Sequence, residues 1–81
     1  MTLYVENLPE SATPASVTAL FAPFGRVLSV SIPVNRSTGV GYGAALVEMD
    51  YGGDGALLAL DEASYRGRSL SVVEALPLAP V

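Results

Sequence analysis

Few side chains in this sequence could carry out chemistry. The 81 residues include eight carboxylates and four arginines but no histidine, and the formal net charge is −4. Histidine is the most common general base and metal ligand, and cysteine, the usual thiolate, is also absent. The acids Asp50, Asp54, Asp61 and Glu62 lack the spacing of a calcium loop, and no Ser–His or paired-carboxylate arrangement is present. We therefore expect no enzyme activity, no metal site and no cofactor.

A glycine-rich stretch and the charge balance restrict the ligands further. Gly39, Gly41 and Gly43 precede a predicted strand instead of a helix N-terminus, and no Lys-Ser/Thr pair follows them. This arrangement argues against a nucleotide-binding loop. A protein that binds bare phosphate backbone normally has a basic face, because neutralising phosphates and releasing counterions supplies much of the affinity. The acidic balance here argues against strong binding of that kind.

Aromatic and guanidinium groups remain as candidates for ligand binding. These groups are the rings of Tyr4 and Tyr42 and the guanidinium groups of Arg36, Arg66 and Arg68. Each has a simpler alternative. Tyr4 could be a half-buried tyrosine of a strand, and the arginines could be solvated partners of surface carboxylates.

Local patterns predict the elements that would position these groups. Four strands are predicted from alternating or β-branched residues. One helix is predicted from a Thr13-Pro14 start and an apolar stripe at Val17, Leu20, Phe21 and Phe24. An apolar run predicts a second, short helix. The strands are expected at 3–6, 27–32, 44–49 and 69–73, the first helix ends at Pro23 and Gly25, and the second covers 56–60. Residues 33–43 and 61–68 are expected to be loops.

The order βαββαβ predicts an α+β, ferredoxin-like domain over residues 1–75, with a four-stranded antiparallel sheet and two helices on one face. Alternation along the strands separates two sets of side chains. The residues expected on the open face include Tyr4, Tyr42, Ala44, Leu46 and Val73. Those expected to face the helices are Leu3, Val5, Val30, Ile32, Ala45, Val47, Met49, Leu70 and Val72.

Two segments resemble the signature motifs of the RNA recognition motif family. Residues 3–8 read LYVENL and match its strand-one hexamer, and residues 42–49 read YGAALVEM at the place of its strand-three octamer. Segments 21–25, 33–39 and 67–72 fit as well, so the resemblance extends over nearly the whole chain. The chain looks most like the short, single-domain bacterial members.

The resemblance implies single-stranded RNA binding through aromatic rings on the open face of the sheet. In that case Tyr4 and Tyr42 could stack on unpaired bases, and phosphate could be contacted by Arg36, Arg66 and Arg68. The octamer departs from the family pattern, because Ala44 and Leu46 replace its stacking aromatics and Tyr42 replaces a basic residue. Base stacking is worth roughly 1–3 kcal/mol per base, so two lost rings could remove about 2–6 kcal/mol. We therefore expect weak RNA binding, with Tyr4 as the retained platform ring.

The same face suggests an alternative function. Its apolar residues, together with the apolar tail 76–81, could contact a protein partner or a second copy of the chain, or the tail could fold back over the sheet. No run of roughly 18–20 apolar residues and no basic signal-peptide start are found, so we expect no membrane span and a cytoplasmic location.

Overall fold

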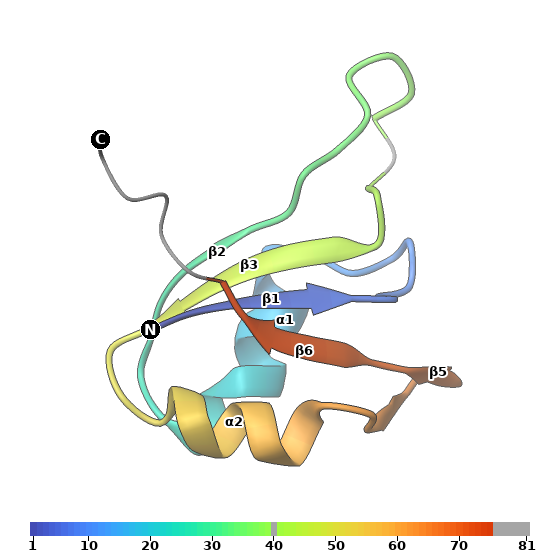
Figure 1. Ribbon diagram of the computed structural model, residues 1–81. Coiled ribbons are helices and arrows are strands. Elements are labelled where there is room, and N and C mark those ends of the chain that lie inside the picture. Colours follow the sequence, from blue (N-terminus) through green and yellow to red (C-terminus); the bar gives the residue numbers. More distant parts are fainter. Residues whose placement is uncertain (40, 76–81) are drawn as a thin grey trace.

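A four-stranded antiparallel sheet forms the centre of the molecule in a computed structural model that describes residues 1–39 and 41–75 (Figure 1). The strands lie in the order β2-β3-β1-β6. The sheet strands are β1 (Thr2–Glu6), β2 (Val27–Ser31), β3 (Ala44–Met49) and β6 (Ser71–Glu74), and the helices are α1 (Pro14–Phe21) and α2 (Gly53–Leu60). This arrangement confirms the predicted α+β, ferredoxin-like fold.

Helix α1 begins at the residue that the sequence predicts. The Thr13 hydroxyl accepts a hydrogen bond from the Ser16 amide at 3.1 Å, and the Ser16 hydroxyl accepts one from the Thr13 amide at 2.9 Å. This reciprocal cap satisfies backbone donors that the first turn of a helix leaves unpaired. The α-helix ends at Phe21, and a 3-10 helix, η1 (Ala22–Phe24), carries the last residue of the predicted stripe.

Helix α2 begins at Gly53, so the predicted start at residue 56 is wrong. Glycine weakens a helix by about 1 kcal/mol relative to alanine, but close packing decides the structure here. A Cβ on Gly53 would lie 2.6 Å from the Met1 sulfur, and one on Gly52 would overlap the carbonyl oxygen of Phe24. The Met1 side chain is flexible and could move, but the Phe24 backbone could not, so Gly52 is the residue that lets the start of α2 approach η1 this closely.

The segment predicted as a loop over 61–68 contains a small hairpin, which corrects that prediction. Strands β4 (Ser64–Tyr65) and β5 (Arg68–Ser69) pair antiparallel, and Arg66 and Gly67 between them have φ of 50° and 80°. Two successive residues with positive φ are typical of the two-residue turn that suits hairpin twist. The predicted fourth strand consequently begins at Ser71 and not at residue 69.

The chain that leads to β6 covers the outer edge of the sheet where this strand begins. Leu70 donates a hydrogen bond to the Ala63 carbonyl at 2.9 Å and accepts one from the Glu62 amide at 2.7 Å. The Val72 amide donates to a carboxylate oxygen of Asp61 at 2.9 Å. These bonds satisfy backbone groups that an edge strand would otherwise leave open.

The helices cover one face of the sheet and form the core with it (Figure 1). All nine residues predicted to face the helices lie in the core or pack against it: seven are fully buried, and Val30 and Ile32 are partly buried. In β2 the register shifts between Val27 and Ser29, and Leu28 is exposed.

None of the described helices is long and apolar enough to cross a membrane. The predicted tail 76–81 lies outside the described residues.

Candidate nucleic-acid interface

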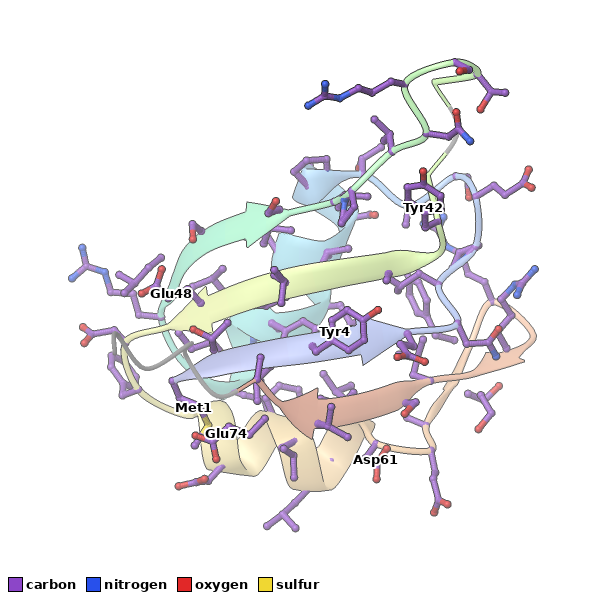
Figure 2. All side chains as sticks on the ribbon, turned by 45° about the horizontal axis from the view of Figure 1, so that its top comes forward. Met1, Tyr4, Tyr42, Glu48, Asp61 and Glu74 are labelled. Carbon is purple, nitrogen blue, oxygen red and sulfur yellow. The ribbon has the colours of Figure 1, made fainter. Side chains whose placement is uncertain are left out.

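Tyr4 lies at the centre of the sheet face that the described helices leave open (Figure 2). Its neighbour on β3 is Leu46 and its neighbour on β6 is Val73. Leu46 is 38% exposed and Val73 is 50% exposed, so Tyr4 has an accessible apolar side chain on each side. The ring of Tyr4 is itself only partly buried. A planar ligand therefore has access to an aromatic surface flanked by aliphatic ones.

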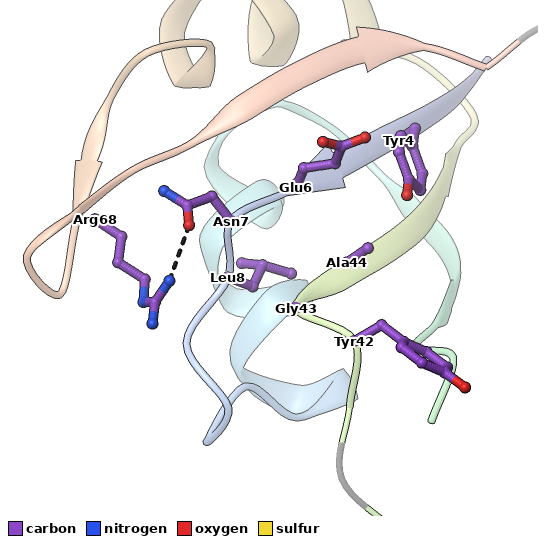
Figure 3. A pocket seen from close by; sticks show the side chains of 8 residues that line it. All are labelled: Tyr4, Glu6, Asn7, Leu8, Tyr42, Gly43, Ala44 and Arg68. Atoms are coloured by element: carbon purple, nitrogen blue, oxygen red, sulfur yellow. Dashed lines mark hydrogen bonds between the residues drawn. The ribbon is translucent and has the colours of Figure 1, made fainter. Parts of the chain in front are cut away.

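Next to Tyr4 the open face is hollowed at the end where β1 stops and β3 begins. The hollow has a volume of about 400 Å³, within the range of roughly 300–1,000 Å³ that is usual for ligand sites. We call it the Ala44 hollow; it is lined by Tyr4, Glu6, Asn7, Leu8, Tyr42, Gly43, Ala44 and Arg68 (Figure 3).

Ala44 does not contribute to an exposed apolar patch, contrary to the prediction. It lies opposite Glu6 in the register of β1 and β3, so it is on the expected face, but only 6% of it is exposed. Figure 3 shows its methyl group with Glu6 and Tyr4 on one side and Tyr42 on the other. Ala44 is therefore part of the floor of the hollow, where the octamer of the family has a ring.

Tyr42 stands at the rim of the hollow and is 67% exposed. It precedes β3, and Gly43 between them has φ of 78° and accepts a hydrogen bond from the Leu8 amide at 2.8 Å. The left-handed residue interrupts the alternation, so the position of Tyr42 does not follow from its spacing to Ala44.

Arg68 brings a positive charge to the opposite rim. Its Nη1 donates to the side-chain oxygen of Asn7 at 2.8 Å, and the Asn7 amide group donates to the Ser69 carbonyl at 2.9 Å. Asn7 has φ of 65°, a conformation that asparagine tolerates better than most residues, and it ends β1. Because a guanidinium carries five N–H donors, Arg68 retains donors for a ligand.

The other two candidate arginines are not among the residues that line the hollow. Nη1 of Arg66 lies 3.4 Å from the Ser11 hydroxyl, and its guanidinium carbon lies 5.1 Å from the centre of the Tyr65 ring. Arg36 is exposed in the turn of the long hairpin between β2 and β3, beyond the bridge between Val34 and Gly41. The structure thus brings Arg68 to Tyr4 and Tyr42.

Sequence reasoning missed two polar members of the hollow, Glu6 and Asn7. Glu6 follows Tyr4 by two positions, so strand alternation alone places both on one face. Asn7 carried no comparable signal, because its role depends on a bond to the hairpin that was not predicted.

Among the described residues, no group of three or more acidic, histidine or cysteine side chains is placed to hold a metal ion.

The fold and its open face define a small α+β domain of the kind that presents a sheet to a ligand, and comparisons with known proteins identify its family. A family model described as RNA recognition motif matches residues 3–71. The chain is 46% identical over 79 residues to a protein of Nostoc sp. named "Putative RNA-binding protein RbpD", covering 95% of this chain and 84% of that one.

Solved structures agree with this family assignment. A crystal structure titled as RNA binding protein PG1 superposes with a TM-score of 0.91 at 32% identity and covers 99% of each chain. A structure titled as a Sex-lethal protein/RNA complex superposes with a TM-score of 0.85 at 30% identity, covering 96% of this chain and 48% of that one. The chain therefore belongs to the RNA recognition motif family, which is not a class of enzymes.

Proposed function

We propose that this chain binds single-stranded RNA through the open face of its sheet, and that the binding is weak. The observation that carries the proposal is the partly exposed ring of Tyr4 at the centre of that face, beside a hollow of about 400 Å³. An aromatic ring on an accessible sheet can stack on an unpaired base of any sequence. The names of its relatives, which describe RNA-binding proteins, support this function.

Composition of the face limits the affinity. Leu46 and Ala44 stand where the family places stacking rings, which removes roughly 1–3 kcal/mol of stacking for each ring. Glu6 and Glu48 also lie on this face, opposite Ala44 and Thr2 in the register, and would repel phosphates. Arg68, held at the rim of the hollow by Asn7, is placed to bind a phosphate there.

Titration of a fluorescent single-stranded RNA of mixed sequence at low salt tests the proposal. Tyr4→Ala should weaken binding about tenfold or more, because one stacked base is worth roughly 1–3 kcal/mol. Tyr51→Ala is the matched control, since Tyr51 is 65% exposed but follows β3 at the opposite end from Tyr42. Circular dichroism should show that both variants remain folded.

Two results would contradict the proposal. The wild-type chain could fail to bind RNA at any concentration reached, or the two tyrosine variants could lose the same affinity. The second result would mean that the open face is not the binding surface.

A second function, protein contact or self-association through the same face, has one observation in its favour. Leu46 and Val73 expose apolar surface on both sides of Tyr4. Apolar patches of this kind often mark protein contacts. Sedimentation of the wild-type chain and of Leu46→Asp would support it if a concentration-dependent dimer disappeared in the variant. RNA binding remains the first proposal because it also accounts for the names of the relatives.

A further inference from the structure

The Ala44 hollow contains a carboxylate that the fold does not use. Glu6 is exposed on the open face, and among residues 1–39 and 41–75 its carboxylate has no hydrogen-bond or ion-pair partner. Even Arg68, which lines the same hollow, is bonded to Asn7 and not to Glu6. An ionised carboxylate has two oxygens that accept hydrogen bonds and none that donates. A ligand that enters the hollow therefore meets a pair of acceptors that are free to bind it.

The surroundings of this carboxylate favour a flat ligand with an apolar face. Tyr4 and Tyr42 line the hollow along with the methyl group of Ala44, so rings and aliphatic surface meet the ligand on more than one side (Figure 3). The charge of Arg68 at the rim offsets that of Glu6 and can hold a phosphate or a ring acceptor of the ligand. Nucleobases have this combination of a flat apolar face and a polar edge.

The four bases differ in the hydrogen bonds that their Watson–Crick edges can donate to a carboxylate. Guanine presents two neighbouring donors, N1–H and the 2-amino group, which can bind both oxygens at once. Adenine and cytosine each place an acceptor nitrogen beside their amino group, and uracil has a single N–H between two carbonyl oxygens. A carboxylate would gain one bond at most from these three bases and would meet an acceptor as well.

We propose that the Ala44 hollow binds a guanine base of single-stranded RNA, with the Glu6 carboxylate accepting hydrogen bonds from N1–H and the 2-amino group. The inference rests on the proposed RNA binding and adds base selectivity to it. The hollow exists because residue 44 is alanine: a ring at this position would fill the space between Glu6 and Tyr42. The loss of a stacking ring thus creates a site in which a base edge can be read.

Base selectivity can be measured with three RNA pentamers, UUGUU, UUAUU and UUIUU, in which inosine differs from guanosine only by lacking the 2-amino group. The wild-type chain should bind UUGUU about fivefold more tightly than UUIUU, the equivalent of one net hydrogen bond, and more tightly than UUAUU. Glu6→Gln should reduce the guanosine-to-inosine ratio to about one, because a carboxamide cannot accept from both donors.

Glu48→Gln is the matched control for charge. Glu48 lies on the same face but pairs with Thr2 and Ser29 in the register, away from the hollow, and its Oε2 is 3.4 Å from the Ser29 hydroxyl. Both variants lose one negative charge, so both should bind UUAUU slightly better, whereas Glu6→Gln should bind UUGUU less tightly because it loses the bonds to guanine. Only Glu6→Gln should lose the preference for guanosine.

A second variant tests the location of the base. Ala44→Phe fills the floor of the hollow with a ring, so the guanosine-to-inosine ratio should fall to about one while overall affinity is maintained or increased. A ratio that stays near fivefold in this variant would overturn the assignment of guanine to the hollow.

The remaining outcomes separate the two proposals. Equal binding of all three pentamers by the wild-type chain, or equal loss of selectivity in the Glu6→Gln and Glu48→Gln variants, would overturn guanine recognition and leave RNA binding intact. Absence of binding to every pentamer and to longer RNA would overturn both.

Discussion

The two faces of the sheet are built from neighbouring residues but differ in composition and in use. Along β1, Leu3 and Val5 are fully buried against the helices, whereas Tyr4 and Glu6 point to the open face. The covered face is apolar except for Glu74, which lies opposite Leu3 on the edge strand, while the open face combines a ring, aliphatic groups and carboxylates. Residues one position apart therefore lie in different environments, one in the core and the next on the face through which we propose that the chain binds RNA.

The largest effect should follow from changing the covered face. Leu3→Ala is expected to lower the free energy of unfolding by about 2–5 kcal/mol, because a fully buried leucine leaves a cavity. Leu46→Ala, on the open face and 38% exposed, should cost less than about 1 kcal/mol. Urea unfolding of both variants measures the difference. Similar losses in the two would show that the open face also supports the fold.

A change on the open face should alter binding and leave folding unaffected. Leu46→Phe restores a ring beside Tyr4 and should strengthen RNA binding by roughly 1–3 kcal/mol, the value of one stacked base. Leu58→Phe, the same substitution at a residue that is 81% exposed on α2, should leave the affinity unchanged. RNA titration of both variants measures this difference in affinity. An equal gain in both would indicate non-specific contact with the added ring.

The smallest effect is expected at the edge where the two faces meet. Asp61→Ala removes the acceptor of the Val72 amide and should lower the free energy of unfolding by about 1 kcal/mol. The loss is limited because Asp61 follows α2, where a negative charge opposes the helix dipole. Asp50→Ala, in the loop before α2, serves as the control. Thermal unfolding of both variants should show a lower midpoint for Asp61→Ala alone.

Sequence patterns were sufficient to predict the helices and strands whose apolar residues repeat with the period of the element. The four strands of the sheet and α1 follow from alternation and from the Thr13 cap, and the core followed because inward residues repeat every second position. The start of α2 was missed because it depends on contacts of Gly52 and Gly53 with segments distant in sequence. The hairpin at 64–69 was missed because two-residue strands are too short to show a period.

The same reasoning explains what could be predicted of the candidate site. Tyr4, Leu46 and Val73 were placed on one face by alternation, and the register groups them as neighbours. The hollow could not be predicted, because it depends on the left-handed turn at Gly43, next to Tyr42, and on the bond that holds Arg68 of the β4–β5 hairpin to Asn7. Backbone turns of this kind change the direction of side chains without leaving a periodic signal.

The bonds at the start of β6 have a consequence for the behaviour of the chain at high concentration. An open strand edge can accept a strand from another molecule, which is how many sheets begin to aggregate. Where β6 begins, the backbone of Glu62 and Ala63 already bonds to Leu70, and the carboxylate of Asp61 accepts from the Val72 amide. A strand from another molecule would first have to displace these bonds to pair along this part of the edge, which protects the start of β6 against polymerisation.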